Sequence, residues 1–323
     1  MSQILPVWRS LLFVPVTQRR FVEGAAKRGA DAIILDLEDS VAASEKERAR
    51  TLVPEAAEIV SRGGADVVVR LNRPMRMTVR DLEAIIGPGV HAVALPKAES
   101  AQHVELVAEI MDELEAERGI PLGTTKMLAM VETASAFFRI AEIAKASSRL
   151  VGLNLGAEDF ALSAGMLPEA EGLFMPKQMC VFAARGAGIM PLGFVGTVAE
   201  FHDLDGFRET VRRSRRLGFM GASVIHPSQV AILNEEFRAA RRRSTMRAGS
   251  SPPMTRRSPK ASARSPSMAR WSTCRLSSAP SCCLNARTRS PPGKQRSRRL
   301  RGLRGDWKGR LLTEHNKNIY RRW

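Results

Sequence analysis

Short apolar segments that end on charged residues recur through the first 237 residues of this 323-residue chain. One of them starts at Leu150, passes through Gly156 and reaches two acids, Glu158 and Asp159. Short apolar or β-branched runs of this kind are typical of buried strands, and the acids place charge where the strand stops. Eight runs fit the pattern: 10–16, 31–38, 66–72, 92–98, 126–133, 150–158, 189–197 and 221–227.

Segments with helical spacing separate these runs. Sequences typical of helix starts occur at Ser44 with Glu47, at Thr78 with Asp81, and at Ser100. After Ser100, apolar residues recur on one predicted helix face, at Val104, Val107, Met111 and Leu114.

Strands that alternate with helices predict a parallel sheet that is buried on both faces. Eight such units within roughly 240 residues favour a closed (β/α)8 barrel of the TIM type over an open doubly wound sheet. Neither a G-x-G-x-x-G sequence after the first strand nor a P-loop occurs, which argues against the nucleotide-binding alternatives. We therefore predict a barrel domain over residues 1–237.

The charge of the chain divides sharply after Phe237. Up to that residue, 26 Lys and Arg stand against 31 Asp and Glu, a net charge of −5. From Arg238 onward, 24 stand against 2, a net charge of +22. The overall charge of +17 therefore belongs to residues 238–323, and the predicted barrel is mildly acidic.

Residues 238–323 are rich in Arg, Ser and Pro without apolar periodicity, which is typical of a disordered segment. One interpretation is a natural basic tail. Our preferred hypothesis is that the reading frame is lost near Arg238, because the change is abrupt and no glycine-rich linker precedes it. A third hypothesis, a nucleic-acid-binding tail, predicts salt-sensitive binding without sequence preference, so we expect no specific nucleic-acid partner.

Cysteine use and hydropathy bear on the compartment. Cys180 is alone in the first 237 residues, so a disulfide framework is excluded there and a reducing compartment is favoured. No apolar stretch has the length of a membrane span, and the N-terminal apolar run is too short for a signal peptide. We expect a cytoplasmic location and no membrane partner.

Two acids follow neighbouring predicted strands. Glu132 ends the fifth strand and Asp159 ends the sixth, so the barrel brings them to adjacent positions on one rim. Two carboxylates with waters and substrate oxygens are typical of a Mg²⁺ site. The alternative is a pair of solvated surface acids or helix caps.

Arg70 ends an apolar strand, where an arginine is unusual. It is a candidate to clamp a substrate carboxylate or carbonyl, and the alternative is a structural ion pair with the acids at 36–39. Asp36 and Glu38 lie on one face of their strand because side chains alternate, so we expect both at the barrel mouth. Lys97 is interpreted more simply as a residue that ends a strand.

Seven segments occur in the order of a known family: 10–15, 34–41, 69–72, 95–97, 131–133, 156–159 and 225–229. Together they resemble the citrate lyase beta subunit-like branch of the HpcH/HpaI aldolase family, which includes malyl-CoA and citramalyl-CoA lyases. The resemblance extends from about residue 9 to residue 237. Any one of the segments is a weak signal, whereas seven in order are highly specific.

The resemblance implies a barrel that forms a homotrimer or a hexamer of two trimers. It implies Mg²⁺-dependent cleavage or formation of a carbon–carbon bond in a 3-hydroxyacyl-CoA such as malyl-CoA, methylmalyl-CoA or citramalyl-CoA. The products would be an acyl-CoA and a 2-keto acid, formed through a thioester enolate.

The resemblance also implies roles for single residues. Glu132 and Asp159 stand at the metal-ligand positions, and Arg70 and Glu132 contact the substrate. Asp36 and Glu38 support Arg70 or metal-bound water. Phe13 and Arg20 fall in the segment that contacts coenzyme A in relatives.

Two departures from the family's pattern are evident. Val16 and Gly24 stand where many members have glycine and lysine, so the nucleotide end of coenzyme A is expected to be held differently. Nothing after Phe237 matches the family's lid segment, whose aspartate handles a proton at the enolate carbon, so we assign no general acid or base. Two alternatives therefore stay open: an aldolase on hydroxy-keto acids without coenzyme A, and a catalytically impaired metal-binding barrel.

Overall fold

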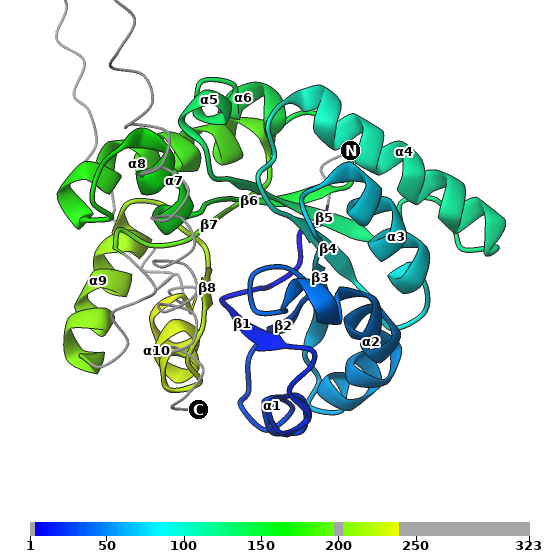
Figure 1. The fold of residues 1–323 in the computed structure, drawn as a ribbon. Helices are drawn as coiled ribbons and strands as arrows, with labels where there is room; N and C mark the ends of the chain where they lie inside the picture. Colours follow the sequence, from blue (N-terminus) through cyan, green and yellow to red (C-terminus); the bar gives the residue numbers. More distant parts are fainter. Residues whose placement is uncertain (1–3, 197–202, 239–323) are drawn as a thin grey trace, which may run out of the picture. The chain divides into compact units, whose positions relative to one another are not determined.

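The computed structural model describes residues 4–196 and 203–238, which contain a ring of parallel strands surrounded by helices (Figure 1). One strand forms within each of the eight predicted runs, so the (β/α)8 prediction is confirmed. The strands are β1 (Ser10–Pro15), β2 (Ala32–Asp36), β3 (Asp66–Arg70), β4 (Ala92–Leu95), β5 (Lys126–Val131), β6 (Leu150–Leu155), β7 (Met190–Leu192) and β8 (Ala222–Val224).

The strands follow chain order around the barrel. Each of β1 to β6 pairs in parallel with the next strand, and β8 returns to pair with β1. β7 and β8 meet through a single bridge between Leu192 and Gly221. The barrel is therefore nearly closed, with its weakest pairing between the last two strands.

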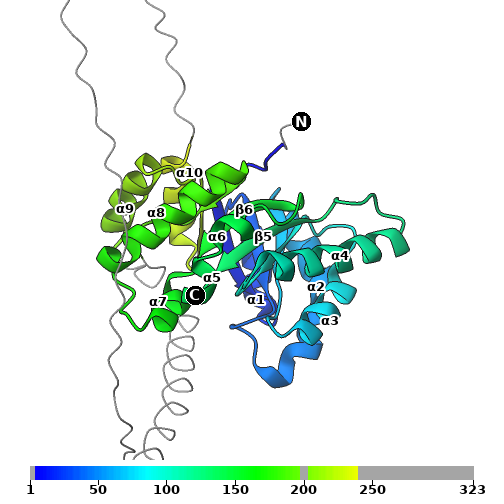
Figure 2. The same cartoon turned by 90° about the horizontal axis from the view of Figure 1, so that it is seen from above.

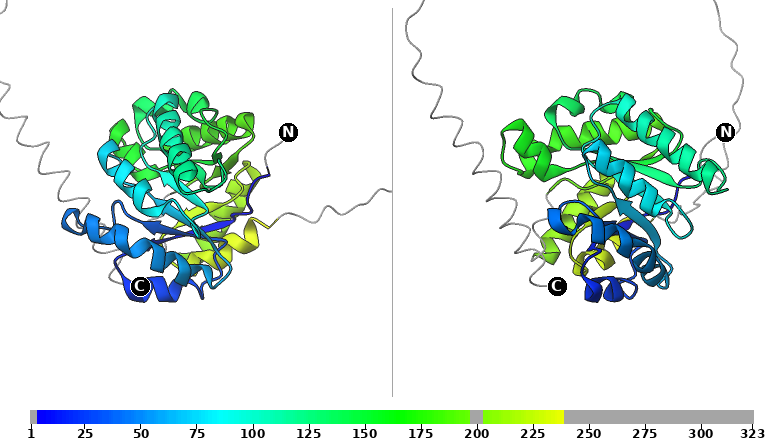
Figure 3. Two further views of the ribbon diagram at one scale, coloured as in Figure 1. Left: turned by 90° about the vertical axis from the view of Figure 1, so that its right-hand side faces the viewer. Right: turned by 45° about the vertical axis from the view of Figure 1, so that its right-hand side comes forward.

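Helices of very different length cover the outside of the barrel, as Figures 2 and 3 show from other sides. They are α1 (Arg19–Ala25), α2 (Lys46–Ser61), α3 (Met75–Ile85), α4 (Ala101–Glu117), α5 (Ala134–Phe137), α6 (Ile140–Ile143), α7 (Ala157–Ala164), α8 (Ala170–Ala187), α9 (Leu204–Arg216) and α10 (Ser228–Glu236), with a 3-10 turn η1 (Ala43–Glu45).

One of the three predicted helix starts is confirmed. The Ser100 hydroxyl accepts a hydrogen bond from the His103 amide and caps α4. The capping box at Ser44 is wrong, because the chain makes the turn η1 there and α2 begins without a side-chain cap. Thr78 lies inside α3, where its hydroxyl donates to the Asn72 carbonyl at 2.7 Å instead of capping the helix.

Alternating strand residues supply two separate cores. One set, such as Leu12, Ile33 and Val67, packs outward against the helices. The other set fills the barrel interior: Leu11, Phe13, Ile34, Val68, Ala94, Leu128, Met130, Val151 and Leu192. A residue two positions beyond an interior residue lies on the same face of its strand, which directs Asp36, Arg70 and Glu132 toward the barrel mouth.

Several strands end before the predicted runs do. β2 stops at Asp36 and β6 at Leu155, so Glu38 and Asp159 lie beyond the ladders. The prediction that Asp159 ends the sixth strand is therefore wrong in detail, since it lies in the first turn of α7. Its place at the rim after β6 is as predicted.

A cavity of about 510 Å³ lies at the rim where the strands begin, opposite the rim that carries Asp36, Arg70 and Glu132. Its lining includes Trp8 and the starts of β3 and β5, at Asp66 and Lys126. The segment that leads into β1 also lines the cavity, and Figure 2 shows this segment on the side of the barrel away from α7.

The predicted basic tail, from residue 239 onward, lies outside the described residues. Within the described part of the chain, no helix is both long enough and apolar enough to cross a membrane. The expected cytoplasmic location stays a prediction.

Gly221 tests the close approach that joins β8 to β1. A Cβ at this position would lie 1.9 Å from the carbonyl oxygen of Trp8, so the backbone itself must move. We expect Gly221→Ala to lower the free energy of unfolding by about 2–3 kcal/mol, measured by urea denaturation. Gly24→Ala is the control: its Cβ would meet nothing within 4 Å, and alanine in α1 is expected to be neutral or stabilising by up to about 1 kcal/mol. Equal effects at both glycines would contradict this account of the barrel closure.

Candidate active site

A buried ion pair between β2 and β3 lies at the centre of the candidate site. Asp36 and Arg70 are register partners on the two strands. The Arg70 Nε donates to Asp36 Oδ1 and Nη2 donates to Oδ2, both at 2.7 Å. The guanidinium lies over the Phe13 ring at 4.8 Å, so one aromatic face and one carboxylate fix its plane.

The charges of this pair outweigh the cost of burial. Burial alone would raise the pKa of Asp36, but the charge and hydrogen bonds of Arg70 lower it to about 2. Burial would lower the pKa of Arg70, but Asp36 and Glu38 hold it well above its usual value. Both groups therefore stay charged at neutral pH.

Two further acids face the remaining side of Arg70. Glu38 Oε2 and Asp39 Oδ2 lie 3.1 and 3.2 Å from Nη1. Glu38 is buried and Asp39 is exposed. As strand alternation predicts, Asp36 and Glu38 both reach the barrel mouth, and the predicted structural ion pair is present as well.

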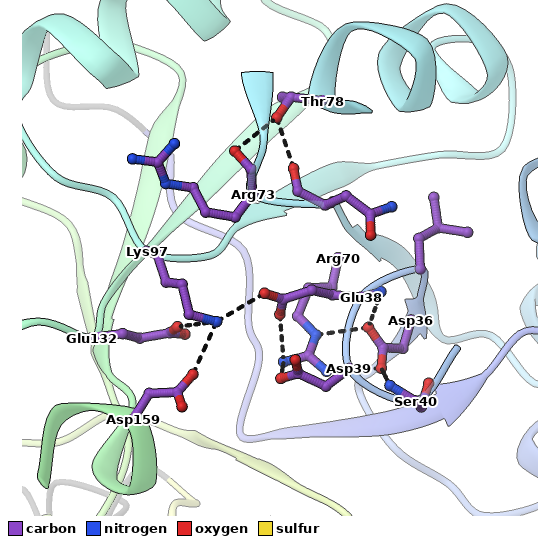
Figure 4. A network of polar contacts seen from close by, with 12 residues as sticks. Asp36, Glu38, Asp39, Ser40, Arg70, Arg73, Thr78, Lys97, Glu132 and Asp159 are labelled. Carbon is purple, nitrogen blue, oxygen red and sulfur yellow. Dashed lines mark hydrogen bonds and ion pairs between the residues drawn. The ribbon is translucent and has the colours of Figure 1, made fainter. Parts of the chain in front are cut away.

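Lys97 lies among the other carboxylates of this rim (Figure 4). Its Nζ is 2.9 Å from Asp159 Oδ2, 3.0 Å from Glu38 Oε1 and 3.5 Å from Glu132 Oε2. Burial would lower the pKa of Lys97, but the acids, above all Glu132, raise it well above its usual value. Among the described residues, Lys97 is the one non-glycine with a positive φ, 48°, a conformation that costs about 1–2 kcal/mol.

The side chain of Glu132 lies close to the backbone at Gly156, the residue that follows β6. A Cβ at Gly156 would lie 2.8 Å from Glu132 Cγ and 3.2 Å from Oε1. Glu132 is 3% exposed, and its buried Oε2 accepts no hydrogen bond among the described residues. Burial, with the nearby charge of Glu38, raises the pKa of Glu132 well above its usual range.

The donor set fits a small divalent cation. The ion pairs of this rim join five carboxyl groups to two cations, Arg70 and Lys97, so the carboxyl groups outnumber the cations by three. The described residues contain no group of three or more His, Cys, Asp or Glu side chains arranged as a metal site. Two carboxylates suffice for Mg²⁺, which keeps waters and binds substrate oxygens, and the buried Glu132 Oε2 accepts no hydrogen bond from the described residues.

A second buried network fixes the loop that follows Arg70. Asp81 Oδ2 accepts from the backbone amide and the side-chain amide of Asn72, at 2.7 and 2.8 Å. The Arg50 Nε donates to Asp81 Oδ1 at 2.5 Å, and both side chains are buried. The loop after β3 is therefore anchored from beneath by α2 and α3.

The structure brings together most of the residues predicted from the sequence. Asp36, Glu38, Arg70, Glu132 and Asp159 are joined by ion pairs, either directly or through Lys97. Phe13 is 8% exposed and supports Arg70 from inside the barrel. Arg20 lies outside this cluster, exposed on α1 with its guanidinium over the Phe21 ring. The coenzyme A contacts of Phe13 and Arg20 stay predictions.

The sequence around Lys97 indicates a strand end and does not mark this residue as part of the site. The signal for it is strand order: β4 lies between β3 and β5, so a residue just beyond β4 must lie between Arg70 and Glu132. The Asp81 anchor has no comparable signal, because the sequence at Thr78 and Asp81 has the pattern of a helix start.

Residues 9–227 match the HpcH/HpaI aldolase/citrate lyase family. The chain belongs to this family. The citrate lyase subunit beta of Leuconostoc mesenteroides subsp. cremoris is 35% identical over 232 residues, covering 71% of this chain and 76% of that protein. The (3S)-malyl-CoA thioesterase of Cereibacter sphaeroides is 36% identical over 233 residues, covering 71% and 77%.

Solved structures of family members have the same fold. The citrate lyase beta subunit of Mycobacterium tuberculosis with oxaloacetate and magnesium is 30% identical, with a TM-score of 0.57 over 72% of this chain and 98% of that chain. CitE of the same organism with magnesium, acetoacetate and coenzyme A is 31% identical, with a TM-score of 0.57 over 72% and 81%. The predicted family is therefore confirmed. It is a lyase family with members that act on coenzyme A thioesters or bind coenzyme A.

The Asp36–Arg70 pair predicts a pH-dependent contribution to stability. The pKa of Asp36 falls from its usual 3.8 to about 2, which corresponds to about 2 kcal/mol. A lowered carboxyl pKa stabilises the fold above the unfolded-state pKa, and this contribution is lost as the pH falls from about 4 to about 2. We expect Asp36→Asn to lower the free energy of unfolding at pH 7 by about 3–5 kcal/mol, because Arg70 loses a buried partner.

The measurement is the difference in unfolding free energy between wild type and Asp36→Asn at pH 7, 5, 4 and 3. The difference is expected to stay constant down to about pH 4 and then to shrink. Glu109→Gln, which changes an exposed carboxylate of α4, is the control and is expected to show neither effect. A difference that persists unchanged at pH 3 would contradict the assignment to Asp36.

Proposed function

We propose that this chain is a Mg²⁺-dependent carbon–carbon lyase that cleaves or forms a 3-hydroxyacyl-CoA such as malyl-CoA, methylmalyl-CoA or citramalyl-CoA. The observation that carries the proposal is the convergence of Glu132 and Asp159 on one point of the barrel mouth, next to Arg70. The relatives whose names include citrate lyase and malyl-CoA, and the neighbours that hold magnesium with keto acids, support the same chemistry.

Glu132 and Asp159 are the residues that would hold the metal. Bound there, Mg²⁺ would supply Lewis acidity that stabilises negative charge on a substrate oxygen. Cleavage breaks the bond between the carbinol carbon and the carbon next to the thioester, so the hydroxyl proton is lost and a thioester enolate leaves. We assign no residue to either proton transfer.

Arg70 would bind the oxygens of the keto-acid portion. Asp36 occupies its Nε and Nη2, so Nη1 is the nitrogen that faces the mouth. Asp39, the exposed partner of Nη1, is the group that a substrate oxygen would replace. Asp36 and Phe13 hold the guanidinium in position, so that it loses little freedom when substrate binds.

Hydrolysis of the thioester is a second candidate function. The Cereibacter sphaeroides relatives that carry the name (3S)-malyl-CoA thioesterase share 35–36% identity with this chain. Both reactions begin from the same bound substrate, and they differ in products. Lyase activity yields a keto acid without free thiol, and hydrolysis yields free coenzyme A thiol without keto acid.

The first test incubates the full chain with malyl-CoA, methylmalyl-CoA and citramalyl-CoA, with and without EDTA. Keto acid is detected as its phenylhydrazone and free thiol with a disulfide reagent. We expect EDTA-sensitive release of keto acid. Arg70→Lys is expected to lower kcat/KM by about 100-fold or more, because lysine cannot make the two parallel hydrogen bonds to Asp36 that orient the guanidinium.

Three other outcomes decide between the alternatives. Thiol release alone supports the thioesterase, and cleavage only of hydroxy-keto acids without coenzyme A supports the aldolase. No metal-dependent product from a folded protein would refute the lyase and leave the impaired metal-binding barrel. The homotrimer or hexamer implied by the resemblance stays a prediction.

Gly156 provides a test of the metal ligand without changing it. Gly156 has φ −70° and ψ 109°, which any residue adopts, and the nearest atoms that an added Cβ would meet are those of the Glu132 side chain. We expect Gly156→Ala to displace the Glu132 carboxylate and weaken Mn²⁺ binding about tenfold or more, with little change in the thermal midpoint. Gly186→Ala, in α8 with open space around it, is the matched control. Unchanged Mn²⁺ affinity in Gly156→Ala would argue against Glu132 as a ligand.

A further inference from the structure

Lys97 has the position that a cation held by the proposed metal ligands would have. Its ammonium lies within 3.5 Å of carboxylate oxygens from Glu38, Glu132 and Asp159, which follow three different strands, β2, β5 and β6. The loop after β4 adopts a positive φ at Lys97 itself, and the next amide, of Ala98, donates to the Met130 carbonyl of β5 at 2.9 Å. The conformation of the backbone therefore directs the Lys97 side chain toward the acids.

We propose that Lys97 is a resident counter-ion, which holds the three carboxylates together before metal binds and competes with a divalent cation for Glu132 and Asp159. The proposal rests on the proposed function only in that these two residues are the metal ligands. It adds a residue that sets the affinity for metal, as a positioning residue and not as a ligand.

Charge balance explains why a counter-ion is needed there. Without Lys97, Glu38, Glu132 and Asp159 would face one another with Arg70 as the one remaining cation in their ion-pair network. Arg70 is already committed to Asp36 through two hydrogen bonds and to the Phe13 ring. Like charges this close repel strongly away from bulk water, so a cation among these acids lowers the cost of holding them together.

The two cations of the rim differ in their freedom to move. Arg70 has a side chain that is 11% exposed and is fixed on one edge and one face. The side chain of Lys97 is 28% exposed, and its three ion pairs are all made by the terminal nitrogen. A flexible stem on a partly exposed side chain lets the ammonium leave the acids while the backbone stays in place.

The test measures Mn²⁺ binding to the full chain without substrate, with free Mn²⁺ counted by electron paramagnetic resonance. Lys97→Met removes the charge and keeps the length of the side chain, and Lys97→Gln is a second neutral variant in case the first folds poorly. Lys97→Arg keeps the charge. Lys126→Met makes the same chemical change at the start of β5, on the opposite rim, where the ammonium donates to the Gly123 carbonyl.

We expect Lys97→Met and Lys97→Gln to bind Mn²⁺ about tenfold or more tightly than wild type, because a unit charge at this spacing no longer opposes the cation. Lys97→Arg and Lys126→Met are expected to stay within about threefold of wild type, since the charge among the acids is retained in both. Equal or weaker Mn²⁺ binding by both neutral variants would overturn the proposal.

Thermal unfolding provides a readout that does not depend on catalysis. Without metal, the neutral Lys97 variants are expected to melt at lower temperature than wild type, because the acids lose their counter-ion. With saturating Mn²⁺, the melting temperature is expected to rise more in these variants than in wild type. A smaller rise than in wild type would also contradict competition between Lys97 and the cation.

The two proposals fail in different ways. If neither wild type nor the neutral variants bind Mn²⁺, Glu132 and Asp159 are not metal ligands, and the proposed function and this inference fall together. If wild type binds Mn²⁺ and the neutral variants bind no more tightly, the lyase proposal stands and the competing role of Lys97 is refuted.

Discussion

The buried pair between Asp36 and Arg70 is the interaction on which the rest of the site depends. A guanidinium inside a barrel mouth is costly unless its hydrogen bonds are satisfied, and Asp36 satisfies two of them in one plane. That plane sets which nitrogen faces Glu38, Asp39 and the open side of the mouth. The register between β2 and β3 is therefore also what orients the substrate-facing edge of the site.

The alternation of strand residues links this pair to the core. Apolar side chains fill the barrel interior up to Ile34, Val68 and Met130, and the next residue on the same face of each strand is charged. The interior packing supports Asp36, Arg70 and Glu132 from below, and it excludes water from one side of each. This support keeps Asp36 fully buried and leaves Glu132 with 3% exposure, so each charge depends on its neighbours more than on solvent.

The sequence predicted the barrel well because eight short runs and their alternation are local patterns. It predicted the convergence of Glu132, Asp159 and Arg70 for the same reason, since parallel strand ends in a barrel share one rim. Local patterns do not determine where a ladder stops, so Asp159 was predicted on a strand and lies on a helix. The position of Lys97 depends on a backbone turn with positive φ, which no local pattern predicts. The role of Asp81 depends on contacts with Arg50 and Asn72, which lie 31 and 9 residues away in the sequence.

The two cations at the barrel mouth, Arg70 and Lys97, have different roles that require different side chains. The cation on β3 must keep one orientation, and a planar arginine between a carboxylate and an aromatic ring meets that requirement. The cation after β4 neutralises acids whose proposed partner is a metal, so it must be able to withdraw from them. A lysine on a flexible stem suits that second task, because its charge is compact and its ion pairs are made by one atom. Exchanging the two residue types would leave a mobile group at the substrate and a fixed one at the metal, which is the opposite of what the acids around them require.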